Sequence, residues 1–351
     1  MHPDPSWPAV TRLDSLTGLR WWAAFAVFLY HMRNLAPVPL LGEVARFGNH
    51  GVAFFFVLSG FVLTWSAGQA GTTASNFYWR RFARIYPAHV VALLLAIPVF
   101  YSLAPDPGQP WVKEFAAAPL LLSLVLLQSW SNEPVILFSG NPAAWTLGVE
   151  AFFYLLHPWA NRGLGKVRER GTLVLLVGVI SLIMAHRVAA LRAPAGWLSQ
   201  LPTPVARLGE FALGMVMARL VQLGVGRWVR PWMGYCAVGA FVGWCVLSRH
   251  YGWSDTWSRT AQRFELQVLA VLFALLILGI ANRDLAQGRS WLRHRLVVTL
   301  GTWSFAFYLV HATAMYAVRD AVGLHRAGRP GCATLAVGAD SSDILRSLGE
   351  S

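Results

Sequence analysis

Long apolar runs recur along most of this chain, separated by short polar segments that are rich in arginine. An apolar run of about 18 residues or more is typical of a helix that crosses the hydrocarbon core of a bilayer. The pattern therefore predicts an all-α fold, a polytopic transmembrane bundle of about ten helices. The candidate spans lie at roughly residues 18–35, 50–67, 84–104, 115–130, 143–160, 171–188, 205–222, 231–248, 263–281 and 297–318.

The basic residues between the apolar runs form short clusters, the pattern of loops on the cytoplasmic side of a membrane. Three candidate spans separate the first cluster from the second, although an even number is needed to return to the same side. One segment between 84 and 160 is therefore expected to be re-entrant, tilted or wrongly counted, and the short run 115–130 is the first suspect. The clusters are Arg80, Arg81 and Arg84; Arg162, Lys166, Arg168 and Arg170; Arg219, Arg227 and Arg230; Arg283, Arg289, Arg293 and Arg295.

Two polar segments flank the predicted membrane domain of residues 16–320. Residues 1–15 are proline-rich and lack the layout of a signal peptide, so we expect a short cytoplasmic lead-in. Residues 321–351 are polar and rich in Gly and Ser, which predicts a disordered tail. No second, soluble domain fits in the chain.

Composition supports a membrane protein. The chain has 351 residues, of which 56% are hydrophobic and 13% charged, and its mean hydropathy is +0.48. The net charge of +13 does not indicate nucleic-acid binding, because the basic residues lie in loops between apolar runs. The three cysteines form neither a disulfide framework nor a zinc spacing, and no metal is expected.

The apolar segment LTGLRWWAAFAVFLYHM (residues 16–32) carries Arg20 near its start and His31 near its end. A helix turns 100° per residue, so these two side chains lie on nearly the same face, about 16 Å apart along the axis. An ionisable group inside a membrane helix is costly and indicates a functional site. Desolvation in the bundle is expected to keep the His31 imidazole neutral and able to accept a proton.

Two further stretches carry polar groups beside apolar runs. GNHGVAFFFVLSGFVLTWS (48–66) contains Ser59 together with the small residues Gly51 and Gly60, which let neighbouring helices approach closely. Ser59 is accordingly either part of a packing face or a catalytic group. FYWRRFARIYP (77–87) places Arg80, Arg81 and Arg84 at a membrane boundary, where they either mark topology or bind phosphate.

Three more stretches carry polar groups within predicted helices. AAWTLGVEAFFYLLHP (143–158) contains Glu150, with Tyr154 and His157 on the same face at i+4 and i+7, and its carboxylate has either a structural partner or a function. RLGEFALGMVMARL (207–220) contains an Arg207–Glu210 pair at i,i+3 that can be a local ion pair. LGTWSFAFYLVHA (300–312) aligns a further polar stripe on one face: Ser304, Tyr308 and His311.

Taken together, these stretches resemble the acyltransferase-3 family of integral-membrane O-acyltransferases. The resemblance covers roughly residues 14–312 and depends on the order and spacing of the motifs. Two features depart from the family: Ala53 stands where an acidic residue is common, and a further C-terminal helix usually follows the segment of His311. The matching motifs are LDSLTGLR leading to His31, GVAFFFVLSGF, Arg81 and Arg84 followed by Ile85 and Pro87, WTLGVEAFFYLLHP, and LGTWSFAFYLVH.

The resemblance implies an enzyme of the cytoplasmic membrane that moves an acetyl or short-chain acyl group from acyl-CoA to an acceptor hydroxyl. His31 is then the catalytic base, with Glu150 as a second candidate catalytic residue. Arg81 and Arg84 are the expected donor contacts, and Arg20 lines the same path. Acyl-CoA is a substrate, and no bound cofactor is expected. Supporting roles are assigned to Arg80, Ser59, Tyr154, Glu210, Ser304, Tyr308 and His311.

The acceptor is left open by the sequence. One alternative is a small hydroxylated natural product such as a macrolide, as in antibiotic biosynthesis. Another is O-acetylation of a cell-envelope polysaccharide, with the acyl group relayed across the bilayer. A transporter or flippase is an alternative of a different class, although we find no obvious internal repeat and no paired broken helices. A membrane scaffold without enzymatic activity is the remaining possibility.

Overall fold

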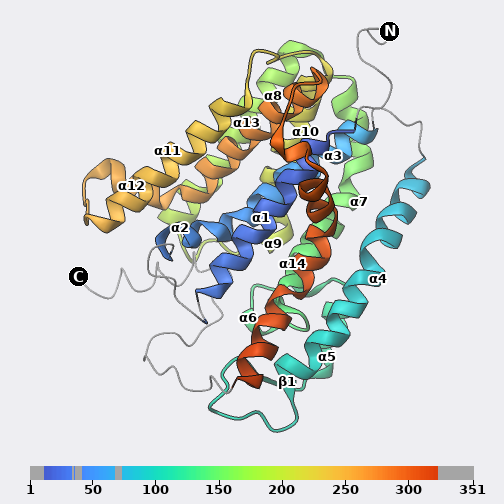
Figure 1. Ribbon diagram of the computed structural model, residues 1–351, viewed down its shortest axis with the longest axis vertical. Coiled ribbons are helices and arrows are strands. Elements are labelled where there is room, and N and C mark those ends of the chain that lie inside the picture. The colour runs from blue at the N-terminus through green and yellow to red at the C-terminus, as the bar shows by residue number, and fades with distance from the viewer. Residues whose placement is uncertain (1–11, 34, 36–41, 68–72, 323–351) are drawn as a thin grey trace.

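The computed structural model describes residues 12–33, 35, 42–67 and 73–322. Most of the predicted lead-in (1–15) and nearly all of the predicted tail (321–351) lie outside these described residues. Within them, nine helices of 15 residues or more form a bundle (Figure 1). These helices are α1 (Asp14–Met32), α3 (Gly51–Ala67), α4 (Ala74–Phe100), α7 (Trp145–Gly165), α8 (Glu169–Arg192), α10 (Leu208–Gln222), α11 (Pro231–His250), α13 (Glu265–Leu285) and α14 (Arg295–Ala321).

Short elements connect the long helices and confirm the all-α class. The two strands that occur in the described part of the chain have two residues each and pair in parallel. The short elements are α2 (Gly42–Arg46), α5 (Ala117–Leu124), α6 (Pro134–Leu137), α9 (Thr203–Ala206), α12 (Thr256–Arg263), the 3-10 helices η1 (Phe47–His50), η2 (Gln128–Trp130), η3 (Pro142–Ala144) and η4 (Trp291–Arg293), and strands β1 (Tyr101–Ser102) and β2 (Lys113–Glu114).

Six helical segments of the described chain are long and apolar enough to cross a membrane. They are Gly42–Ala67, which includes α2, η1 and α3, and the helices α4, α8, α11, α13 and α14. The predicted membrane bundle is therefore confirmed, but the count of about ten spans is not. Helices α1 and α7 carry charged residues, and α10 has only 15 residues.

The candidate span 115–130 is wrong as a membrane crossing. Its helix α5 has eight residues, which span about 12 Å of the 30 Å needed. The chain then turns at Leu126, which has a φ of +61°, and enters η2. Only α4 and α7 thus run between the first and second basic clusters, so an even number of long helices joins them.

Hydrogen bonds bring the basic loops together at one end of the bundle, termed here the arginine-rich end (upper part of Figure 1). Arg219 Nη2 donates to the Gly165 carbonyl at 2.8 Å, which joins the end of α10 to the end of α7. Ser15 Oγ donates to Asp284 Oδ1 at 2.6 Å, which joins the start of α1 to the end of α13. Helices α1 and α14 therefore both begin at this end, and their later residues lie toward the opposite end.

Glycines allow two pairs of helices to pack with their backbones in contact. A Cβ atom on Gly60 of α3 would lie 2.0 Å from the Phe211 carbonyl oxygen of α10, and one on Gly301 of α14 would lie 1.9 Å from the Thr17 oxygen of α1. At Gly51 a Cβ atom would lie 2.8 Å from the nearest atom of α1. The predicted packing role of the small residues in segment 48–66 is confirmed at Gly51 and Gly60.

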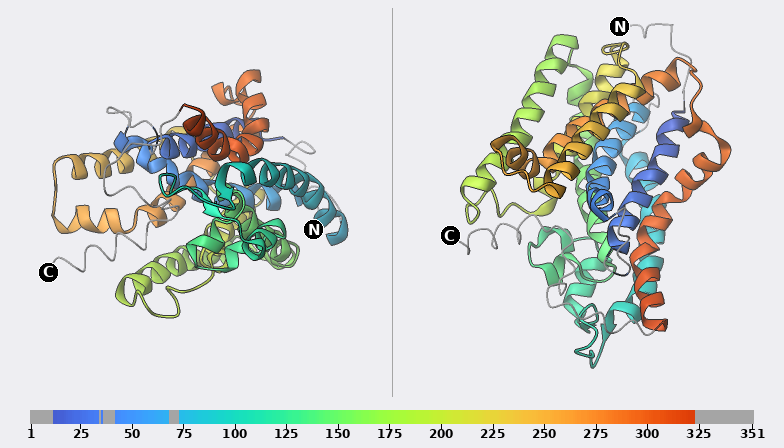
Figure 2. Two further views of the ribbon diagram at one scale, coloured as in Figure 1. Left: turned by 90° about the horizontal axis from the view of Figure 1, so that it is seen from below. Right: turned by 60° about the vertical axis from the view of Figure 1, so that its left-hand side comes forward.

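The outer surface of the bundle suits a lipid environment. None of the most apolar stretch of α8 is buried inside the protein; α8 lies at the edge of the bundle (Figure 2). Exposed tryptophans occur near both ends, as in the aromatic belts of membrane proteins. Those nearer the arginine-rich end include Trp79, Trp159, Trp228, Trp232 and Trp291, and those nearer the opposite end include Trp197, Trp253 and Trp257.

Candidate active site

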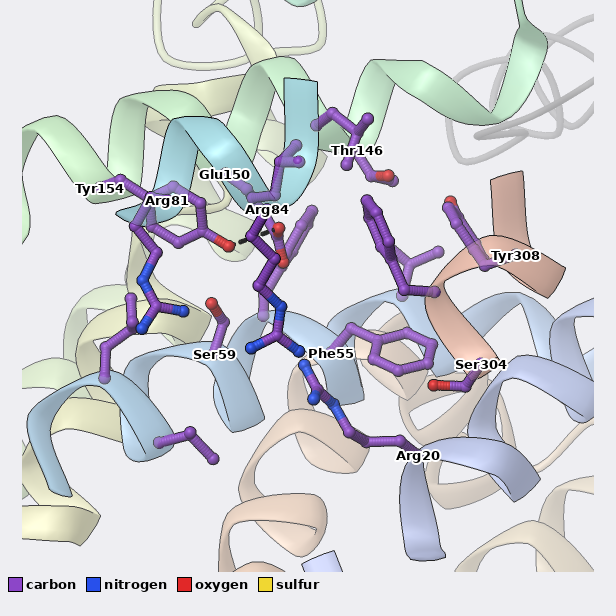
Figure 3. A pocket seen from close by; sticks show the side chains of 17 residues that line it. Arg20, Phe55, Ser59, Arg81, Arg84, Thr146, Glu150, Tyr154, Ser304 and Tyr308 are labelled. Atoms are coloured by element: carbon purple, nitrogen blue, oxygen red, sulfur yellow. Dashed lines mark hydrogen bonds between the residues drawn. The ribbon is translucent and has the colours of Figure 1, made fainter. Parts of the chain in front are cut away.

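Two neighbouring cavities hold most of the predicted site residues. The larger one, termed the arginine cavity, has a volume of about 90 Å³ and lies among α1, α3, α4, α7 and α14 (Figure 3). The smaller one, termed the histidine cavity, has a volume of about 20 Å³ and is nearer the opposite end. Predicted site residues that line the arginine cavity are Arg20, Ser59, Arg81, Arg84, Glu150, Tyr154, Ser304 and Tyr308.

Three guanidinium groups converge in the arginine cavity (Figure 3). Arg81 and Arg84 face it together because they are three residues apart on α4, whose first turn is capped by the Thr73 hydroxyl accepting from Asn76 N. Arg84 is exposed, whereas Arg20 and Arg81 are half-buried. Three cations beside one carboxylate leave an excess of positive charge, which suits an anionic ligand.

Arg81 packs against an aromatic ring, and one of its nitrogens makes no hydrogen bond within the described part of the chain. Its Cζ atom lies 5.6 Å from the centroid of the Phe77 ring, a cation–π contact, and its buried Nε has no hydrogen-bond partner among the described residues. The His157 ring also stacks on Phe77, with the two ring centroids 5.2 Å apart. His157 does not line the arginine cavity, although it was predicted on the face of Glu150.

Glu150 is the carboxylate of the arginine cavity, and Tyr154 orients it. Tyr154 Oη donates to Glu150 Oε2 at 2.7 Å, one helical turn along α7. The Ser59 hydroxyl lies next to the Tyr154 phenol (Figure 3). Ser304 Oγ donates to the Gly301 carbonyl of its own helix at 2.8 Å. Glu150 and Ser59 thus point toward the guanidinium groups, whereas the Ser304 hydroxyl is used by the backbone.

The histidine cavity joins the ends of predicted motifs that are far apart in sequence. The rings of His31 on α1 and His311 on α14 are 5.2 Å apart, centroid to centroid. His311 Nδ1 lies 2.5 Å from the Tyr308 carbonyl. A carbonyl only accepts, so Nδ1 carries the proton and Nε2 is an acceptor. That Nε2 has no hydrogen-bond partner among the described residues.

His31 does not line the arginine cavity, but the two cavities adjoin. Val52 and Tyr308 line both of them. Arg20 and His31 face the two cavities from one helix, as the spacing predicted. The arrangement is thus a cavity lined by three arginines and one carboxylate, adjoining a second cavity that contains a pair of imidazoles.

Two predicted supporting residues lie elsewhere. Arg80 is exposed and lines neither cavity. Glu210 is buried on α10 and accepts from Arg207 Nη1 at 3.0 Å, which confirms the predicted local ion pair. In the part of the chain that the structure describes, no group of three His, Cys, Asp or Glu side chains is placed to hold a metal ion. The absence of a metal stays a prediction.

Sequence reasoning missed several residues of the histidine cavity. Asn49 on η1, Trp145 at the start of α7 and Tyr316 on α14 line it. Asn49 lies within the motif GNHG and Trp145 within WTLGVE, so the sequence offered a signal for these two residues. Their convergence depends on contacts between distant segments, and no local spacing reports it.

The geometry places a cavity rich in arginine next to paired histidines inside a membrane bundle, and comparison with known proteins identifies the family of the chain. The family model described as "Acyltransferase domain" matches residues 13–338. The chain belongs to this family, the acyltransferase-3 family, and the resemblance inferred from the motifs is confirmed. It is an O-acyltransferase.

Individual relatives agree with this class. The chain is 35% identical to Acyltransferase MdmB of Streptomyces mycarofaciens over 323 residues, 87% of this chain and 79% of that protein. It is 29% identical over 160 residues to Peptidoglycan O-acetyltransferase OatA of Listeria monocytogenes, covering 42% of this chain and 24% of that protein. It is 24% identical over 326 residues to Putative peptidoglycan O-acetyltransferase YrhL of Bacillus subtilis, covering 85% of this chain and 48% of that protein. No solved structure matches the chain.

Proposed function

We propose that this protein, as a multi-pass enzyme of the cytoplasmic membrane, transfers an acetyl or short acyl group from acyl-CoA to a hydroxyl of a small natural product such as a macrolide. The observation that supports this most is the adjacency of the arginine cavity and the histidine cavity. The former offers guanidinium groups for a phosphorylated donor, and the latter offers an imidazole for the reacting hydroxyl. The similarity to Acyltransferase MdmB covers most of both chains, which favours a similar acyl-transfer reaction for this protein.

The donor binds through its phosphates in this proposal. Arg84, exposed at the rim, meets the phosphates first, and the half-buried Arg81 binds them more strongly because the surroundings are less polar. The long flexible arm of the donor then runs past Arg20 toward His31. Glu150, which accepts a hydrogen bond from Tyr154, offsets part of the positive charge of the arginines. The phosphates are therefore not held too tightly, and both unreacted donor and the CoA product can dissociate.

The transfer takes place in the histidine cavity. His31 accepts the proton of the acceptor hydroxyl as its oxygen attacks the thioester carbonyl. The carbon–sulfur bond breaks, and the leaving CoA thiolate takes the proton back from the imidazolium. The developing oxyanion needs N–H donors, and the cavity supplies the Asn49 amide and the Trp145 indole. His311, with its free Nε2, lies beside His31 and orients the acceptor.

A direct assay tests this proposal. Purified protein in detergent is incubated with labelled acetyl-CoA and a panel of hydroxylated acceptors, and mass spectrometry detects one added acyl group. We expect the product from the wild type and from His294→Ala, a control at an exposed histidine of the arginine-rich end. We expect none from His31→Ala, and full activity of that variant would refute the mechanism.

A second candidate function is O-acetylation of a cell-envelope sugar. One observation favours it: the histidine cavity is lined by the later residues of α1 and α14, toward the end opposite the basic loops, so donor and acceptor approach from different sides. Reconstituted vesicles distinguish the two candidates. Product that forms only when acyl-CoA and acceptor are on opposite sides of the membrane supports the envelope acceptor, and product that needs both on the same side supports the first proposal. Membership of an acyltransferase family favours both candidate acyl-transfer functions over the transporter alternative.

A further inference from the structure

Two residues line both cavities and therefore form the partition between them. Tyr308 and Val52 are the lining residues that the two cavities have in common. Tyr308 belongs to α14 and Val52 to α3, so they face the path from two helices. A chain that crosses this shared boundary from the arginine cavity toward His31 therefore passes between these two side chains.

The backbone at the partition is fixed, which leaves the Tyr308 side chain as its movable part. The Leu309 carbonyl accepts a hydrogen bond from Asn141 Nδ2 at 2.7 Å, and the Tyr308 carbonyl accepts one from His311 Nδ1. These bonds hold one turn of α14 to η3 and to the histidine pair. A tyrosine ring turns about only two side-chain torsions, so it can swing while this turn of helix stays in place.

The Tyr308 ring is packed in the closed position. It is 8% exposed, its centroid lies 6.0 Å from that of Phe55 at an interplanar angle of 61°, and it lies 5.5 Å from the His311 ring. Its hydroxyl interacts with the Thr146 side chain on α7. These contacts are weak one by one, of the order of 1 kcal/mol for an aromatic pair, so a ligand can displace the ring.

We propose that Tyr308, facing Val52, is the gate between the two cavities and the residue that limits the length of the transferred acyl group. The inference rests on the proposed function. Beyond the gate the histidine cavity has about 20 Å³, room for about one water molecule, so each further methylene of the acyl group has to displace the ring further. Once the donor arm lies in this opening, the displaced ring packs against it and fills the remaining space, which keeps water of the arginine cavity away from the thioester and suppresses wasteful hydrolysis.

Substitution of the ring tests the gate. For purified Tyr308→Ala, kcat/KM is measured with acetyl-, butyryl- and hexanoyl-CoA, together with thioester hydrolysis in the absence of acceptor. A pocket discriminates about 10-fold or more against a single extra methylene, and hexanoyl is several methylenes longer than acetyl. We therefore expect the hexanoyl-to-acetyl ratio to rise at least about 10-fold, and hydrolysis to rise with it. Tyr308→Phe keeps the ring and loses only the hydroxyl, so its ratio is expected to remain close to that of the wild type.

Two further variants separate gating from loss of structure. Val52→Ala widens the path from the opposite side and is expected to shift the ratio in the same direction, which also provides the measurement if Tyr308→Ala does not fold. Tyr251→Ala, an exposed tyrosine far from both cavities, controls for general effects of removing a ring. An unchanged ratio together with unchanged hydrolysis in a folded Tyr308→Ala or Val52→Ala protein would overturn the proposal. A wild type with no acyl-CoA-dependent transfer would instead overturn the proposed function.

Discussion

The unequal surroundings of Arg81 and Arg84 predict unequal losses when each is removed. Arg81 is half-buried over the Phe77 ring, whereas Arg84 is exposed. A hydrogen bond to a charged group away from bulk water contributes about 1.5–3 kcal/mol, and an exposed ion pair contributes about 0.2–1 kcal/mol. At about 1.4 kcal/mol per factor of ten, Arg81→Ala should raise the KM for acetyl-CoA about 10- to 150-fold, and Arg84→Ala about 1.5- to 5-fold.

The assay compares two donors that differ in their phosphates. Initial rates are measured with acetyl-CoA and with the acetyl thioester of N-acetylcysteamine, which keeps the thioester but has no phosphate. If the arginines bind phosphate, both variants should use the truncated donor as well as the wild type does. Arg81→Lys should recover little, because an ammonium group does not form the paired hydrogen bonds of a guanidinium. Arg80→Ala, at an exposed neighbour outside the cavity, serves as the control.

Two results would refute this reasoning. An equal loss with both donors would mean that Arg81 supports the fold and not the donor. A larger effect at Arg84 than at Arg81 would mean that exposure does not govern the strength of the contact.

Three other predictions concern the framework. Gly60→Val places a side chain against a carbonyl of α10 and should lower the free energy of unfolding by about 1–3 kcal/mol, measured as a lower Tm in detergent; an unchanged Tm would contradict the close packing. Glu210→Gln leaves Arg207 without its charge partner. It should lower the free energy of unfolding by about 3 kcal/mol and leave the KM for the acyl-CoA donor unchanged. Burial lowers the pKa of Lys113, which donates to the Phe138 carbonyl, to about 8. The folded protein then binds fewer protons than the unfolded chain between about pH 8 and the ordinary lysine pKa of 10.5, so its stability should rise with pH in that window, and Lys113→Met should flatten that dependence.

The helices of this protein were largely predictable from sequence, and the one wrong span has a physical cause. Segment 115–130 is apolar throughout, and periodicity alone does not distinguish a short helix near one end of the bundle from a crossing. The deciding features are the turn at Leu126, with its positive φ, and the eight-residue length of α5. The parity of the basic clusters had already pointed to this segment.

The site was predictable where it depends on helical spacing. Arg81 and Arg84 on one face of α4, and Glu150 with Tyr154 on α7, follow from i,i+3 and i,i+4 neighbours. The meeting of His31 with His311 could not be derived, because it depends on how α1 packs along α14. The division of the predicted residues between two cavities depends on such packing as well, and the chemical roles of these residues stay predictions.

The glycine contacts divide the molecule into a fixed part and an adjustable part. Backbone touches backbone where α1 crosses α14 and where α3 crosses α10, so the histidine pair sits in an interlocked frame that cannot slide. Helix α4 has no comparable lock among these contacts, and only 22% of its most apolar stretch is buried. Arg81 and Arg84 thus lie on a wall of their chamber that has no such backbone contact, whereas Arg20 lies on the fixed helix α1. Loading and unloading of a large nucleotide can be accommodated by that wall alone, while the reacting groups keep their alignment from one turnover to the next.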